Sequence, residues 1–136
     1  MCKISRRDSL KASLLASAAP AFYSSRAWSA HFEPIRIGLI GVGNRGAANL
    51  AAVGHEQVVA LCDVDDRYLK SAAKQYQDAA TFRDYREMLN ADLDLDAVVV
   101  STPDHTHAPA SMAAMQRGLH CYCEKPLTHS VEEAKA

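Results

Sequence analysis

The stretch that decides the fold is IRIGLIGVGNRGAANL, residues 35–50. It starts as an apolar, β-rich run and then passes through Gly41, Gly43 and Gly46, which stand at the spacing G-x-G-x-x-G. The residues that follow have a helical composition, and we expect this helix to end at Gly54. A strand, a glycine loop of this spacing and a helix in succession are typical of a dinucleotide-binding site.

Each glycine has its own physical role in such a loop. Gly41 permits a tight turn, Gly43 lets the backbone approach a pyrophosphate, and Gly46 lets the helix pack close to the sheet. The N-terminus of the helix presents free N–H groups and the positive end of its dipole to the phosphates. Asn44 and Arg45 lie inside this loop and are therefore further candidate cofactor-binding residues.

An acidic residue completes the pattern. Asp63 lies 22 residues after Gly41, at the end of the next apolar run, QVVALCD, residues 57–63. A carboxylate at this place can accept hydrogen bonds from both ribose hydroxyls and would repel a 2′-phosphate. We therefore expect NAD rather than NADP. Arg45 and Arg67 keep NADP open as an alternative, since either side chain could reach a phosphate.

Strand-like and helix-like segments alternate along the rest of the chain. Further strands are expected at 79–82, 95–103 and 119–124, and further helices at 65–77, 84–90 and 107–118. Asp84 with Glu87, and Ser130 with Glu133, have the spacing of capping boxes that begin helices. The alternation predicts an α/β fold: a Rossmann-type, doubly wound parallel sheet with helices on both faces.

No metal site is expected. Cys121 and Cys123 alternate on a predicted strand, so they share one face and are better explained as small buried side chains. No second cysteine pair completes a zinc site in the sequence. The segment DHTH contains ligand-type residues, but no further ligand set accompanies it. His105 is expected to be a polar loop residue.

The charge distribution excludes one class of partner. Residues 1–29 hold five basic residues and one acid, and the remainder holds ten basic against fifteen acidic residues, a net of −5. No basic stripe remains on which a nucleic-acid backbone could lie, so no nucleic-acid partner is expected.

The first 29 residues have the order of an export signal. A basic start containing Arg6-Arg7 precedes a short, mildly apolar stretch and then Ala27-Trp28-Ser29, after which we expect cleavage. The paired arginines resemble a twin-arginine (Tat) signal, which predicts export to the periplasm by the Tat machinery and no stable membrane anchor. The alternative is a cytoplasmic amphipathic helix. The one boundary we expect, near residue 30, leaves a domain at 35–136.

Five features taken together resemble one family. They are GVGNRG, Asp63, STPDHTHA (residues 101–108), GLHCYCEKPL (residues 118–127) and the twin-arginine start. In this order and spacing they look like the glucose–fructose oxidoreductase, inositol dehydrogenase and MocA family (Gfo/Idh/MocA). The resemblance covers about residues 35–136 and implies an NAD(P)-binding Rossmann domain.

The resemblance implies roles for the second half of the site. Thr102 and Pro103 would line the cofactor near its nicotinamide. His107 would lie beside the nicotinamide ribose, and Glu124 would contact the same region. These residues lie at or just beyond the carboxyl ends of two predicted strands, where doubly wound sheets bind their ligands.

The catalytic residue implied by the resemblance is Lys125, which would reach the substrate hydroxyl and help to stabilise its charge. A cis peptide bond before Pro126 is a further hypothesis. Members of the family carry a second, substrate-binding domain with a catalytic Asp or His, which this chain does not include. We therefore expect a truncated cofactor domain that is inactive alone, from a full-length protein that forms a homo-oligomer.

The resemblance favours an exported NAD-dependent oxidoreductase that moves hydride between nicotinamide and a hydroxyl-bearing carbon of a sugar or polyol. One alternative is a glycosidase of the same superfamily that uses tightly held NAD in a transient oxidation. That branch also carries twin-arginine signals but tends to lack the lysine of Glu-Lys-Pro, so Lys125 argues against it. Another alternative is a non-catalytic NAD-binding module.

Overall fold

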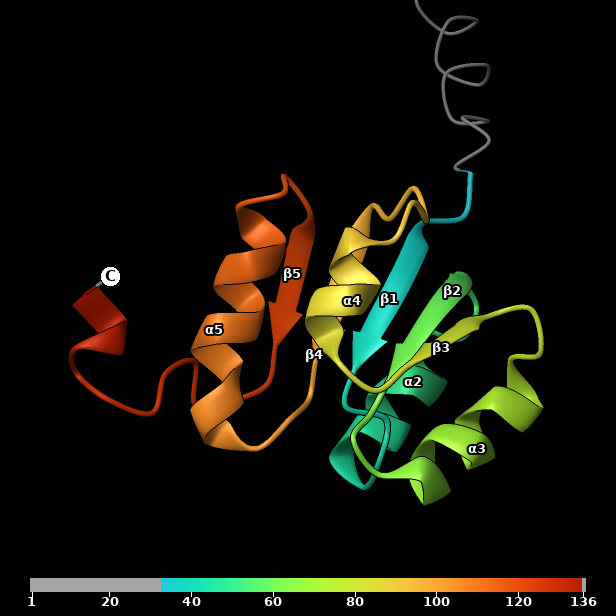
Figure 1. Cartoon of the computed structure of the whole chain (residues 1–136), viewed down its shortest axis with the longest axis horizontal. Coiled ribbons are helices and arrows are strands. Elements are labelled where there is room, and N and C mark those ends of the chain that lie inside the picture. The colour runs from blue at the N-terminus through green and yellow to red at the C-terminus, as the bar shows by residue number, and fades with distance from the viewer. Residues whose placement is uncertain (1–32, 136) are drawn as a thin grey trace, which may run out of the picture. The chain divides into compact units, whose positions relative to one another are not determined.

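The computed structural model describes residues 33–135, which form one parallel sheet with helices on both of its faces (Figure 1). The strand order is β3-β2-β1-β4-β5, and each neighbouring pair is parallel. The strands are β1 Arg36–Ile40, β2 Gln57–Cys62, β3 Ala80–Phe82, β4 Ala97–Val100 and β5 His120–Cys123. The order reverses between β1 and β4, so the predicted doubly wound Rossmann-type fold is confirmed.

Four α-helices connect the strands. They are α2 Arg45–Val53, α3 Asp66–Gln75, α4 Tyr85–Asn90 and α5 Asp104–Met115. Helices α4 and α5 lie side by side on one face of the sheet, while α2 and α3 cover the other (Figure 1). A sheet covered in this way buries both faces of its central strands, which explains why the strand sequences are apolar runs rather than alternating patterns.

Neighbouring residues of one strand feed the two separate cores. Leu39 of β1 packs toward α2 and α3, with Leu50 and Leu69, and is fully buried. Ile40, the next residue, packs on the opposite face with Met88 of α4. The cysteines of β5 belong to this second core as partly buried side chains, which agrees with their expected packing role.

The helices differ at their N-termini. Asp65 caps α3 and Asp84 caps α4, each accepting a hydrogen bond from the backbone N–H two residues on. Asp84 thus caps α4 with Arg86 N–H as the donor (2.8 Å), but no bond from Glu87 to the Asp84 N–H completes the expected capping box in the described part of the chain. No side chain caps α2, which begins directly after the glycine loop. The Gly46 N–H donates to the Gly43 carbonyl oxygen (2.7 Å), and the other N–H groups of the first turn are available to a ligand.

Several boundaries differ from the sequence-based expectation; the strand expected at 95–103, for example, covers only Ala97–Val100. The helix expected at 107–118 begins at Asp104, so His105 lies in the first turn of α5 rather than in a loop. Pro103 precedes this turn and Asp104 lies within it, and both residues favour a helix start. Ser130 and Glu133 do form the reciprocal capping box, but the helix that follows is described only as a 3₁₀ turn, Glu133–Lys135.

The predicted export signal at residues 1–29 lies outside the described residues. Within residues 33–135, no helix has the length and apolar character needed to cross a membrane.

Candidate functional site

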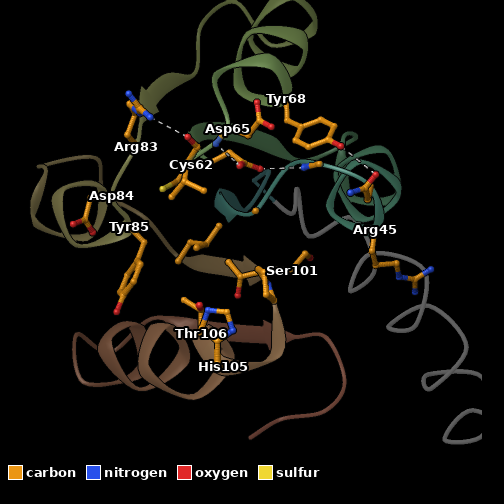
Figure 2. Close-up of a pocket in the computed structure, with 18 of the residues that line it drawn as sticks. Arg45, Cys62, Asp65, Tyr68, Arg83, Asp84, Tyr85, Ser101, His105 and Thr106 are labelled. Atoms are coloured by element: carbon orange, nitrogen blue, oxygen red, sulfur yellow. Dashed lines mark hydrogen bonds between the residues drawn. The ribbon is translucent and has the colours of Figure 1, made fainter. Parts of the chain in front are cut away.

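A cleft of about 860 Å³ opens at the carboxyl ends of the strands, where the strand order reverses. Figure 2 shows its walls, with Asp65 and Tyr68 on one side and His105 and Thr106 of α5 on the other. The predicted site residues that line this cleft are Gly41, Gly43, Asn44, Arg45, Asp63, Thr102 and Pro103. Segments separated by more than sixty residues therefore contribute to a single concave surface.

At two positions of the glycine loop, neighbouring backbone atoms leave no room for a side chain. Gly41 has φ +87°, and a Cβ there would lie 2.7 Å from the carbonyl oxygen of Ser101. A Cβ at Gly46 would lie 2.1 Å from the Gly41 carbonyl oxygen. The start of α2 therefore packs directly on the loop backbone, which is the close approach expected for the third glycine.

Tyr68 is a part of this loop region that the sequence analysis did not single out. A Cβ at Gly43 would lie 2.5 Å from the Tyr68 ring. The ring comes from α3 and lines the cleft (Figure 2), with its hydroxyl 3.5 Å from the Asn44 Oδ1. Two features thus favour glycine at position 43: the Tyr68 ring leaves no space for a side chain, and the Gly43 backbone lines the cleft. The apolar helical spacing of Tyr68 gave no sign of this role.

The cleft offers groups that fit a dinucleotide. The uncapped N-terminus of α2 supplies N–H donors for phosphate oxygens. Thr102 lines the cleft, and its Oγ1 is buried without a hydrogen-bond partner among the described residues. A buried hydroxyl without a partner is unfavourable by about 1–3 kcal/mol, and a ligand that bonds it removes that penalty.

Asp63 is held by the loop that it faces. Its Oδ2 accepts hydrogen bonds from Val42 N–H (2.9 Å) and Gly43 N–H (3.2 Å), while Oδ1 accepts one from Asp65 N–H (2.9 Å). An ionised carboxylate has about four acceptor positions, so capacity remains for a hydroxyl donor. The carboxylate that we expect at the ribose therefore also fixes the shape of the phosphate loop.

Arg45 and Glu124 contact each other, an arrangement that the sequence analysis did not foresee. Arg45 Nε lies 2.8 Å from Glu124 Oε1, and Asn49 Nδ2 donates to the same oxygen at 3.0 Å. The hydrogen bonds from Asn49 and then Arg45 lower the pKa of Glu124 to about 2. Arg45 reaches the cleft rim but points away from the other labelled residues (Figure 2). In this arrangement the Arg45 guanidinium pairs with Glu124 and is not directed toward a phosphate in the cleft.

Asn49 connects this pair to the neighbouring strand. Its side chain is 9% exposed and also donates to Ser101 Oγ at 2.8 Å. Asn49 therefore joins α2 to the residues after β4 and β5. A single buried amide in an alanine-rich helix was the only signal that could have pointed to it.

His107 is buried behind the cleft and does not line it. Its side chain is 1% exposed, with Nε2 2.7 Å from the Thr102 carbonyl oxygen and Nδ1 2.6 Å from the Pro126 carbonyl oxygen. The role implied by the resemblance, beside the nicotinamide ribose, stays a prediction. What the structure describes is a link between two turns.

Lys125 lies exposed in one of these turns, directly after β5. The Lys125–Pro126 peptide bond is cis, which confirms that hypothesis. Lys125 does not belong to the lining of the cleft, and its catalytic role stays a prediction. The neighbouring residue Pro126 contacts the His107 ring through its carbonyl oxygen, and the same ring contacts the carbonyl oxygen of Thr102, a cleft residue.

The cysteines and histidines do not form a metal centre in the described part of the chain. No group of three His, Cys, Asp or Glu side chains within residues 33–135 is placed to hold a metal ion. Burial, and then the neighbouring charge of Asp63, raises the pKa of the Cys62 thiol to about 12. Cys62 is therefore a protonated core thiol at neutral pH rather than a nucleophile.

The comparison with protein families decides the identity of this fold. The description "Oxidoreductase family, NAD-binding Rossmann fold" (GFO_IDH_MocA) matches residues 35–136. The chain belongs to this family. The resemblance seen in the sequence and the expected NAD cofactor are thereby confirmed.

Relatives of the Gfo/Idh/MocA chain include proteins of two activity classes. The α-N-acetylgalactosaminidase of Shewanella oneidensis is 40% identical over 113 residues, 74% of this chain and 24% of that protein. A glycosyl hydrolase family 109 protein of Solibacter usitatus is 36% identical over 155 residues, 98% of this chain and 35% of that protein. The chain thus spans about a quarter to a third of these curated relatives.

A solved structure gives the other class. The scyllo-inositol dehydrogenase of Lactobacillus casei, with bound NAD(H) and scyllo-inositol, is 29% identical with a TM-score of 0.67, over 75% of this chain and 31% of that one.

Proposed function

We propose that this chain is the cofactor-binding part of an NAD-dependent oxidoreductase that acts on a hydroxyl-bearing carbon of a sugar or polyol. The observation that carries the proposal is the cleft at the strand-order reversal, which combines the glycine loop, Asp63 and the unpartnered Thr102 hydroxyl. The bound inositol of the scyllo-inositol dehydrogenase supports the substrate class.

Each group of cleft residues would contact a different part of the cofactor. The backbone of the glycine loop and the first turn of α2 would bind the phosphates, and Asp63 would accept from the ribose hydroxyls. Thr102 and Pro103 would orient the nicotinamide, and bound NAD⁺ would supply the hydride acceptor. Lys125 would donate to the substrate oxygen and stabilise negative charge there.

The cofactor part of the proposal is tested by calorimetric titration of the chain with NAD. The catalytic part requires the full-length protein and a panel of sugars and polyols, with NADH formation as the readout. Lys125→Met should lower kcat by about 10²-fold or more, the size of effect typical for a lost proton-transfer or charge-stabilising group, while the Kd for NAD stays unchanged. A variant with unchanged kcat would exclude Lys125 as the catalytic residue.

A second candidate function is NAD-dependent glycoside hydrolysis. The observation that favours it is the 40% identity to the α-N-acetylgalactosaminidase of Shewanella oneidensis. The Glu124-Lys125-Pro126 sequence, in which the resemblance associates the lysine with dehydrogenases, favours the first candidate. The two functions differ in their products. A hydrolase would release the aglycone from a nitrophenyl glycoside without accumulating NADH, whereas a dehydrogenase would accumulate NADH from a free sugar or polyol.

We also propose export to the periplasm by the Tat machinery and a homo-oligomeric full-length protein. The support for export is the order of Arg6-Arg7, the apolar stretch and the small residues before position 30. Fusion of residues 1–32 to a reporter tests it: replacement of both arginines by lysine should abolish periplasmic reporter activity. Unchanged export of that variant would contradict the Tat assignment.

A further inference from the structure

The arginines around the cleft are all engaged by acids. The pairs are Arg45 with Glu124 (2.8 Å), Arg67 with Asp65 (2.6 Å), Arg83 with Asp66 (3.4 Å) and Arg86 with Asp84 (3.4 Å). Asp63 differs from these acids because the hydrogen bonds it accepts come from backbone N–H groups. An arginine that stays paired with its acid is not free to neutralise a 2′-phosphate, so these ion pairs bear on the choice between NAD and NADP.

Asp65 holds Arg67 in the most complete of these pairs. Its Oδ1 accepts from Arg67 N–H (2.9 Å) and from Nε (3.1 Å), and its Oδ2 accepts from Nη2 (2.6 Å). These hydrogen bonds lower the pKa of Asp65 to about 2, so the carboxylate is charged at neutral pH. A backbone N–H and a guanidinium edge are also the donors that a phosphate group uses. The Asp65 carboxylate thus already accepts hydrogen bonds from the donors that an external phosphate would need.

Asp65 is also next to the residue expected at the ribose. Its backbone N–H donates to Asp63 Oδ1 at 2.9 Å, and both side chains line the cleft. If Asp63 accepts from the ribose hydroxyls, a phosphate in place of the 2′-hydroxyl would lie beside the Asp65 carboxylate. It would meet two negative charges, and the guanidinium that could neutralise it would already be occupied.

We propose that Asp65 is a second cofactor-specificity residue, which excludes the 2′-phosphate of NADP by keeping its own carboxylate on Arg67. The proposal rests on the assignment of the cleft to NAD and adds a determinant distinct from Asp63. It also accounts for Arg67, which the sequence alone left as an argument for NADP. The pair itself contributes little to stability, because the Arg67 side chain is 85% exposed and surface ion pairs are weak.

The test is the variant Asp65→Ser, which keeps a side chain able to cap α3 while removing the charge. Titration calorimetry of the full chain would give the Kd for NAD and for NADP. We expect the NADP affinity to rise about tenfold or more, the gain from one charge-assisted hydrogen bond, with Asp63 still opposing a larger change. The NAD affinity should change less than about threefold.

Two controls make the result specific. The double variant Asp65→Ser/Arg67→Gln should lose the gain, since the released guanidinium is its source. Asp84→Ser is the matched single variant, because Asp84 caps α4 and pairs with Arg86 two residues on, as Asp65 does with Arg67. Because Asp84 also lines the cleft, we expect it to raise the NADP affinity less than Asp65→Ser does.

Three results would overturn the proposal. One is an Asp65→Ser variant that binds NAD normally without any gain for NADP. Another is a gain that survives the loss of Arg67, and the third is an equal gain in Asp84→Ser. The NAD titration of the unaltered chain distinguishes these results from a failure of the cleft as the cofactor site.

Discussion

At the scale of single residues, His107 shows how a buried side chain can serve a site without touching a ligand. Both of its ring nitrogens lie within 2.7 Å of carbonyl oxygens, those of Thr102 and Pro126. Carbonyl oxygens only accept hydrogen bonds, so a neutral ring donates to one of them and a doubly protonated ring donates to both. His107 thus contacts both the turn after β4 and the turn that carries Lys125, and it donates a hydrogen bond to at least one of the two carbonyl oxygens.

Replacement of His107 by Phe should therefore destabilise the domain. The change leaves at least one partly buried carbonyl oxygen without its donor, and we expect the free energy of unfolding to fall by about 1–3 kcal/mol. Urea denaturation measures this value. His105→Phe is the matched control, because His105 lies exposed on the same helix and should change stability by less than about 0.5 kcal/mol. Equal losses in the two variants would contradict a linking role.

The lowered pKa of Glu124 predicts how the free energy of unfolding depends on pH in the acid range. Its pKa is lowered from an ordinary 4.5 to about 2 in the folded chain, so its contribution to stability is complete above pH 4.5. That contribution is lost as the pH falls through the folded-state value near 2. We expect Glu124→Gln to show a flatter decline in stability over this window, measured by urea unfolding at a series of pH values. A decline as steep as that of the unaltered chain would show that Glu124 is not the group responsible.

At the scale of elements, the loop between β1 and α2 is shaped by contacts that come from elsewhere in the chain. The carbonyl of Ser101 leaves no space for a Cβ at Gly41, and the ring of Tyr68 leaves none at Gly43. A glycine motif therefore reflects steric limits set by neighbouring elements as well as the needs of a phosphate.

The two demands on Gly43 can be separated by experiment. Gly43→Ala should lower the free energy of unfolding by about 1–3 kcal/mol, because the new Cβ overlaps the Tyr68 ring. Adding Tyr68→Ala should restore part of that loss. If the backbone at Gly43 also approaches the pyrophosphate, the Kd for NAD will stay weakened in the double variant relative to Tyr68→Ala alone. Recovery of full NAD affinity would leave steric fit to Tyr68 as the sole role.

The elements themselves were largely predictable from the sequence, since local apolar runs, glycines and caps determine them. The start of α5 was misplaced because DHTH was interpreted by its polarity, whereas Pro103 and Asp104 begin a helix. The pairing of Arg45 with Glu124, 79 residues apart, could not be foreseen. It depends on the side-chain conformations of α2 and of the turn after β5 in the assembled sheet, and periodicity carries no information about these.

At the scale of the whole molecule, the parallel order β3-β2-β1-β4-β5 is what brings these residues together. Each strand ends at the same edge of the sheet, so the loops after β1, β2, β3 and β4 converge on one cleft. The site is thus a property of the assembled sheet, and a ligand that binds there stabilises the entire domain.

NAD should accordingly raise the resistance of the chain to urea. At a concentration a hundredfold above its Kd, a ligand that binds only the folded state adds about 2.7 kcal/mol to the free energy of unfolding. NADP at the same concentration should add less, because Asp63 and Asp65 oppose its 2′-phosphate. Identical shifts for the two nucleotides would contradict the specificity argued from these carboxylates.

The bracing of the glycine loop by Asp63 has a consequence for the kinetics of recognition. Because Oδ2 of Asp63 already bonds Val42 N–H and Gly43 N–H, the backbone torsions of the loop are fixed when the chain folds. The conformational entropy of this loop is therefore lost when the chain folds and not when the ligand binds. We therefore expect an incoming nucleotide to need no rearrangement of this segment, and its association rate to be set by diffusion and orientation rather than by a slow ordering step.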